Sequence, residues 1–138
     1  MTFEDARRFA EEFARQRSRG RGEALWSPQG VLHYPFADRL IGGDEIGALC
    51  DLTAANSPNL TWEMLGWTHR DDVIVVEWRC TNRYGETTMV FDGVDRLTVK
   101  DGKIVQEIVY ADTAPLRAAR AGTRLEPLVV LPRATAPV

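Results

Sequence analysis

GVDRLTVKDGKIVQEIVYAD, the stretch from Gly93 to Asp112, has the pattern of two long strands joined by a tight turn at Asp101-Gly102. Apolar side chains occupy alternate positions of the first strand, and Asp95 falls on their face. An ionised carboxylate among apolar side chains is costly, so it has to be paired, hydrogen-bonded, neutralised, or set in a cavity that uses it. Asp95 is therefore the first candidate for a functional residue.

The length of the turn determines which residue lies across from Asp95. A two-residue turn at Asp101-Gly102 places Asp95 opposite Ile108. A three-residue turn, Lys100 to Gly102 with a glycine bulge, places it opposite Glu107. We expect the three-residue turn, which sets two carboxyl groups side by side, where they rarely both ionise and one pKa rises.

The totals describe a small, mildly acidic chain. At 138 residues it has the length of one domain, able to bury about two-thirds of its unfolded-chain surface. Only Cys50 and Cys80 are cysteines, and neither a signal segment nor a membrane-spanning run appears, so we expect a cytoplasmic protein with no membrane partner. The net charge of -3 argues against a nucleic-acid partner. Because no metal-ligand spacing or phosphate-binding loop appears, we expect no metal and no cofactor.

Helices and one short strand are predicted in the first 60 residues. Thr2 and Asp5 resemble a capping box at the start of a helix. A strand is expected from Val31 to Phe36, and a further helix after Asp44 as its N-cap. The first helix has an apolar stripe opposite a charged, solvated face, and the stripe comprises Phe3, Ala6, Phe9, Ala10 and Phe13.

Four strands in an antiparallel meander are predicted next, separated by short turn signals: Leu60 to His69, Val73 to Arg83, Glu86 to Lys100 and Lys103 to Thr113. The last of them is apolar on both faces, so the sheet needs two covers. Helices supply one cover, and a second copy of the chain is the simplest source of the other. We therefore expect a homodimer that forms through the sheet.

The C-terminal region is expected to be less regular. Pro115 to Ala121 has room for one or two helical turns, and three prolines follow. We predict a single domain over residues 1–122 and an extended tail over 123–138, in which Leu125 to Leu131 packs as an extended segment and the last residues are loose.

The order of these elements resembles the cone-shaped fold of nuclear transport factor 2, which ketosteroid isomerase, limonene epoxide hydrolase, scytalone dehydratase and the SnoaL-like polyketide cyclases share. The motifs look most like the SnoaL-like branch: Tyr34-Pro35-Phe36, then Ile41-Gly42-Gly43-Asp44-Glu45-Ile46, and Gly93-Val94-Asp95 followed by Asp101-Gly102-Lys103-Ile104 and Tyr110-Ala111-Asp112. The resemblance implies an α+β fold in which a curved, mostly antiparallel sheet is wrapped by about three N-terminal helices around a pocket.

The resemblance also carries roles residue by residue. The position of the proton-moving aspartate of ketosteroid isomerase is Tyr34 here, and that of its oxyanion-donating tyrosine is Phe13. The acid that stays protonated in an apolar pocket corresponds to Asp95, which is retained. Asp112 is similar in position to the acid-base aspartate of the polyketide cyclases, although the expected turn points it away from Asp95. His33 alternates away from Tyr34, which disfavours it as a general base.

In this fold the concave face of the sheet surrounds the pocket. Asp95, Glu107 and Tyr34 are the polar groups that we expect in the pocket. By the alternation of the strands, the rest of its wall should consist of Trp26, Trp62, Met64, Trp78, Cys80, Phe91, Val109 and Ala111. The alternative that these aromatic side chains simply fill a core stays open.

The function expected from these residues is binding of an apolar small molecule that carries a carbonyl group. Asp95 and Glu107 would exchange protons with it and Tyr34 would hydrogen-bond to it, in a cofactor-independent isomerisation, cyclisation or dehydration. A non-catalytic ligand-binding module or dimeric scaffold of the same fold is the alternative. A protein-binding domain like nuclear transport factor 2 itself is a third.

Overall fold

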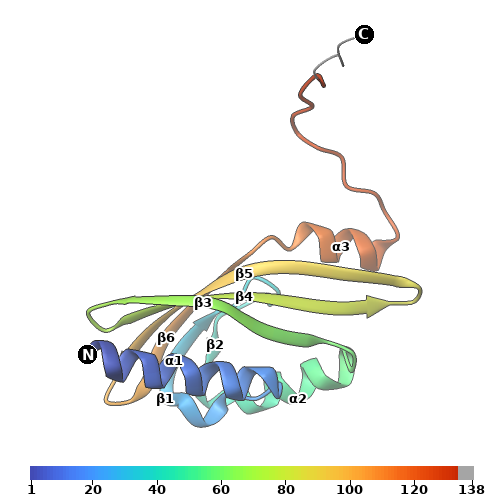
Figure 1. Cartoon of the computed structure of the whole chain (residues 1–138). Coiled ribbons are helices and arrows are strands. Elements are labelled where there is room, and N and C mark those ends of the chain that lie inside the picture. Colours follow the sequence, from blue (N-terminus) through green and yellow to red (C-terminus); the bar gives the residue numbers. More distant parts are fainter. Residues whose placement is uncertain (134–138) are drawn as a thin grey trace.

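Six strands form one curved mixed sheet, and helices α1 and α2 lie on the same side of it (Figure 1). The structure is a computed structural model that describes residues 1–133. The strand order is β2-β1-β6-β5-β4-β3, antiparallel except where β1 runs parallel to β6. The helices are α1 (Phe3–Ser18), α2 (Ile46–Asn56) and α3 (Ala114–Ala121), with 3-10 turns η1 (Glu23–Leu25) and η2 (Gly43–Glu45). The strands are β1 (Trp26–His33), β2 (Ile41–Gly42), β3 (Thr61–Arg70), β4 (Val73–Tyr84), β5 (Thr87–Lys100) and β6 (Lys103–Ala111). The predicted α+β fold, with its meander of four antiparallel strands, is confirmed.

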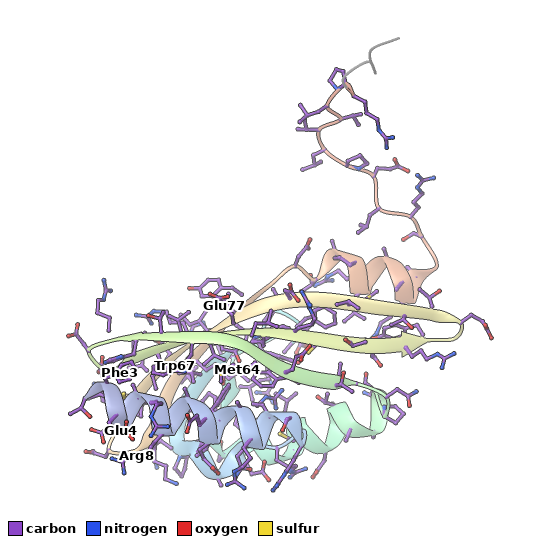
Figure 2. The ribbon with its side chains drawn as sticks, in the orientation of Figure 1. Phe3, Glu4, Arg8, Met64, Trp67 and Glu77 are labelled. Carbon is purple, nitrogen blue, oxygen red and sulfur yellow. The ribbon has the colours of Figure 1, made fainter. Side chains whose placement is uncertain are left out.

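Helix α1 begins at the predicted capping box. The Thr2 hydroxyl accepts a hydrogen bond from the Asp5 amide, and the Asp5 carboxylate accepts one from the Thr2 amide. Ala6 and Phe13 of the predicted stripe are buried. Phe3 of the same stripe stays 63% exposed. Its ring packs against Trp67 of β3, with ring centroids 5.4 Å apart (Figure 2). The core lies between α1, α2 and the sheet; its largest fully buried side chains are Phe13, Ile74, Val76, Leu97 and Ile104.

Three predicted boundaries in the first 60 residues are wrong. The strand that was expected to reach Phe36 ends at His33. β1 begins at Trp26 and not at Val31, because it pairs with β6 from Trp26 onward and passes Ser27 to Gly30 through a register shift. Asp44 does not cap α2; it lies inside η2, which leads into the helix. The backbone is tight here, since a Cβ on Gly43 would lie 1.9 Å from the Ser27 carbonyl oxygen.

The turn between β5 and β6 has two residues, not the three that we expected. Asp101 and Gly102 both have positive φ, 52° and 73°, as a two-residue hairpin turn of this kind requires. Lys100 therefore pairs with Lys103. Asp tolerates the left-handed conformation better than most residues, which makes the short turn accessible.

A bulge in β6 then changes the register. Val105 has no partner in β5, and this one extra residue sets Asp95 opposite Val109. The predicted pairing of Asp95 with Glu107 is thus wrong, and so is the alternative with Ile108. Glu107 still turns inward, because the unpaired residue inverts the alternation of β6.

The tail does not pack as predicted. Residues 123–133 form no helix or strand, and the expected packing of Leu125 to Leu131 is wrong, since this segment is exposed throughout (Figure 1). Pro127 and Pro132 have no backbone N–H to donate in strand pairing, and α3 ends at Gly122, whose φ is 66°. The remainder of the predicted tail, residues 134–138, lies outside the described residues.

Candidate active site

A cavity of about 580 Å³ lies between the sheet and the helices. Its wall combines residues from β1, β4, β5 and β6 with residues from α1, α2 and α3. Most of the wall is aromatic or aliphatic, and a few polar groups converge on it, as is typical of small-molecule sites. The polar side chains on the inner wall include Asn82 and Tyr84 of β4, Asp95 of β5 and Glu107 of β6, together with Tyr34, which directly follows β1.

Asp95 is held in this wall by Trp78. The Trp78 indole nitrogen donates a hydrogen bond to Asp95 Oδ1 over 2.8 Å, and only 3% of Asp95 is exposed. The contact depends on Gly93, which pairs with Trp78 across β4 and β5. A Cβ on Gly93 would lie 2.2 Å from Trp78 Cζ2, so only glycine lets the indole lie flat over β5 and reach the carboxylate.

Glu107 and Asp95 are buried neighbours on the inner face of the sheet and influence each other's pKa; a hydrogen bond between two carboxyl groups forms only when one of them carries a proton. Burial raises the pKa of Asp95, while hydrogen bonds from Trp78 and Glu107 favour its ionised form. Burial and then the charge of Asp95 raise the pKa of Glu107 well above its usual range. The lower proton affinity of Asp95 makes Glu107 the protonated donor and Asp95 the carboxylate acceptor.

Tyr34 lies directly after β1 and lines the same cavity. Burial raises the pKa of its hydroxyl to about 12, and the charges of Asp95 and Glu107 contribute in the same direction. The hydroxyl therefore stays protonated at neutral pH and can donate a hydrogen bond. Its ring packs on Phe36, with centroids 5.1 Å apart.

The residues predicted for the wall divide into two groups. The structure brings six of the eight to the cavity: Trp26, Trp62, Trp78, Cys80, Phe91 and Val109. It does not bring Met64 or Ala111 there. These two lie in one row across the sheet with Trp78 and Gly93, and the large indole of Trp78 fills the inner side of that row. Ala111 instead lines a second hollow, of about 400 Å³.

Several lining residues were missed from the sequence. Arg17 of α1 continues the spacing of Ala10 and Phe13, so its position on the inner stripe was readable from the sequence, but the predicted stripe ended at Phe13. Asn82 continues the alternation of β4 and donates a hydrogen bond to the Tyr84 hydroxyl over 2.9 Å. Helix α3 also contributes to the wall, and nothing in the local sequence indicated where that helix would lie.

Two other candidates from the sequence lie outside the cavity. Asp112 lines the second hollow, and its carboxylate accepts a hydrogen bond from the Ala114 amide at the start of α3 over 3.0 Å. His33 ends β1 and is not part of the cavity wall. Cys80, by contrast, is on the wall, and burial raises its pKa to about 12, which keeps the thiol protonated.

Within residues 1–133, no group of three or more His, Cys, Asp or Glu side chains is arranged to hold a metal ion. Among the same residues, no helix combines the length and apolarity needed to cross a membrane.

The sequence matches the model of the SnoaL-like domain over residues 6–107. Among solved structures, AclR, a candidate hydroxylase from Streptomyces galilaeus, has a TM-score of 0.73 at 16% identity, with 92% of this chain and 87% of that chain covered. A candidate SnoaL-like polyketide cyclase from Jannaschia Sp. CCS1 has a TM-score of 0.70 at 13% identity, with 83% and 90% covered. IdmH, a candidate polyketide cyclase from Streptomyces antibioticus, has a TM-score of 0.68 at 15% identity, with 84% and 98% covered. No curated protein matches the sequence. At these identities the likeness to the solved structures concerns the fold.

Proposed function

The chain belongs to the SnoaL-like domain family, and from that premise we propose that its cavity binds an apolar carbonyl compound and acts on it by cofactor-independent acid-base chemistry. The observation that carries the proposal is that two carboxyl groups, Asp95 and Glu107, are buried together in the wall of a largely apolar cavity. Paired acids whose environments push their pKa values apart are a recurrent acid-base device in enzymes.

The roles follow from the charge state of the pair. Asp95, the ionised member, accepts a proton from the carbon next to the substrate carbonyl. Glu107 delivers its proton to the carbonyl oxygen, and the Tyr34 hydroxyl donates a second hydrogen bond to the same oxygen. The product of this step is a neutral enol. In a ketone with a double bond next to the enolised carbon, Asp95 returns its proton to the far end of the conjugated dienol while Glu107 takes back the enol proton, which completes an isomerisation. In a cyclisation the enol carbon attacks a second carbonyl, Glu107 takes back the enol proton and Asp95 protonates the new alkoxide; neither reaction needs an oxidant or a reductant.

Binding without turnover is the second candidate function, and one observation favours it. At the position where ketosteroid isomerase has its base, this chain has Tyr34, whose pKa of about 12 prevents it from accepting a proton at neutral pH. In that case the cavity would sequester a ligand, with the carboxyl pair serving as a polar anchor.

One experiment separates the two candidates. A panel of neutral aromatic ketones, beginning with 2-acetonaphthone and 2-tetralone, is screened by thermal shift. Compounds that bind are then incubated in deuterated water with wild-type protein and with Asp95→Asn. Deuterium exchange next to the carbonyl, catalysed by the wild type and lost in the variant, supports acid-base chemistry. Binding with no exchange above background supports the binding module, and binding of no ketone contradicts both.

We also propose that two copies associate through the outer face of the sheet. The hollow of about 400 Å³ on that face is lined by Leu65, Val94 and Tyr110, and both Leu65 and Tyr110 are about half exposed, at 47% and 55%. Burial of apolar side chains in a second copy is the simplest way to cover them.

A further inference from the structure

Arg17 contributes a charge to the cavity that the acid-base proposal does not use. Its side chain is half-buried and lines the wall, one turn of α1 beyond Phe13. The ion pairs made by α1 involve Arg7, Arg8 and Arg15, and Arg17 has no ion-pair or hydrogen-bond partner for its guanidinium among residues 1–133. A half-buried guanidinium without an acidic partner is poorly compensated, and its five donors suit a carboxylate.

The position of Arg17 relative to the carboxyl pair defines the space for a ligand. Its charge lowers the pKa of Asp95, of Glu107 and of Tyr34, so the guanidinium acts on all three from within their electrostatic range. It forms no ion pair with either carboxylate. All four residues line one cavity, which therefore offers a ligand both a cationic group and a buried pair of acids.

Other arginines surround the same cavity. Arg19 at the end of α1 and Arg117 and Arg120 of α3 are exposed and line it. Among the described residues, the acidic side chains on the cavity wall are Asp95 and Glu107 alone, and both are buried. The charged side chains on the exposed part of the wall are thus all arginines, which attract an anion and orient it as it enters.

We infer that the ligand carries a carboxylate on its apolar body, and that Arg17 binds this group while the carbonyl end faces Asp95 and Glu107. This inference rests on the proposed function and narrows its substrate class to oxo acids. Bidentate pairing of guanidinium and carboxylate would fix the orientation of the ligand as well as its affinity. A rival explanation is that Arg17 only moderates the charge of the acid pair, which predicts no preference for anionic ligands.

Two probes of the same shape distinguish these explanations. 2-Naphthoate is an anion at neutral pH and 2-naphthamide is neutral. Binding of each is followed by quenching of tryptophan fluorescence, which is available because Trp26, Trp62 and Trp78 line the cavity. We expect naphthoate to bind about tenfold more tightly than naphthamide, a difference that added salt reduces.

Variants then assign the preference to Arg17. Arg17→Gln should abolish it by weakening naphthoate binding and leaving naphthamide unchanged, whereas Arg17→Lys should retain most of it. Arg8→Gln is the matched control, because Arg8 is on the same helix but points away from the sheet (Figure 2). Equal binding of the two probes to wild type, or equal weakening of both by Arg17→Gln, would overturn the inference and leave the proposed function standing. Binding of neither probe would contradict both.

Discussion

The indole nitrogen of Trp78 in β4 donates a hydrogen bond to Asp95 Oδ1 in the adjacent strand β5 over 2.8 Å, on the inner face of the sheet. This contact favours the ionised form of Asp95. It therefore distinguishes the two buried carboxyls, since no such donor reaches Glu107 within residues 1–133 and burial raises the pKa of Glu107 well above its usual range.

Trp78→Phe should remove the hydrogen bond that favours the ionised form of Asp95. Loss of the donor leaves a buried carboxylate with one fewer partner, so we expect the pKa of Asp95 to rise further and the free energy of unfolding to fall by roughly 1.5–3 kcal/mol. Carboxyl titration by NMR and urea denaturation measure the two effects. Trp62→Phe is the control: it also truncates a cavity tryptophan, and an equal rise of the Asp95 pKa in both variants would contradict the role of the hydrogen bond.

Gly93→Ala should disturb the same contact by a steric route. The added methyl group meets the ring of Trp78 and forces it off the strand, which we expect to cost about 1–3 kcal/mol of stability. Gly66→Ala is the matched control in β3, because a Cβ there meets nothing within 4 Å. Urea denaturation of both variants checks this. A Gly93→Ala protein as stable as Gly66→Ala would mean that the indole has room to move.

Glu107→Gln should change how stability depends on pH. The folded-state pKa of Glu107 is raised, so between its unfolded and folded pKa values the native state binds more protons, and stability falls as pH rises through that window, by at most about 1.4 kcal/mol per pH unit. Surface acids such as Glu23 and Glu45, with pKa values of about 2, act in the opposite sense and lose their contribution only in strong acid. The stability difference between wild type and Glu107→Gln, measured at pH 5 and pH 8, should therefore shift in favour of the variant at pH 8. An unchanged difference would indicate that Glu107 ionises normally.

Tyr34→Phe should separate binding from stability. The Tyr34 hydroxyl has no hydrogen-bond partner among residues 1–133, so we expect a change in unfolding free energy of less than about 0.5 kcal/mol. Affinity for 2-acetonaphthone should fall about tenfold, because the ketone oxygen loses a donor. Thermal unfolding and fluorescence titration measure the two quantities. A large loss of stability with unchanged affinity would make Tyr34 a structural residue.

Leu65→Arg and Tyr110→Arg test the proposed dimer. Each places a charge in the hollow on the outer face of the sheet, so light scattering at micromolar concentration should shift from a dimeric to a monomeric mass. Leu40→Arg, at an equally exposed leucine elsewhere, should leave the mass unchanged. A monomeric wild type would rule out the dimer directly.

The sequence was sufficient for features that depend on local signals or simple alternation. The capping box at Thr2 and Asp5, the positions of the turns in the meander and the inward face of Asp95 followed from neighbouring residues, although the length of the last turn did not; the SnoaL-like resemblance is confirmed by the family match. The register of β6 could not be predicted from the sequence, because that strand is apolar on both faces and its pattern favours neither register. The partner of Asp95 was also missed, since the role of Trp78 depends on the space above Gly93 and not on its position in the strand.

Arg17 escaped prediction for a different reason. On a helix, a charged residue next to other charged residues is usually solvated, and Arg7, Arg8 and Arg15 follow that rule. Arg17 differs from these residues because it lines the cavity between the sheet and the helices. That cavity forms through contacts between distant parts of the chain, which the local sequence does not show.

The unpaired Val105 also has a consequence for the order in which the sheet assembles. A hairpin that closes from its turn forms the pair of Lys100 and Lys103, then that of Val99 and Ile104, and at its third step must choose between Val105 and Gln106 as the partner of Thr98. If it took Val105, every later pair would shift, and Glu107 would leave the interior. Whether Glu107 faces the interior beside Asp95 therefore depends on a choice of partner made within three residues of the turn.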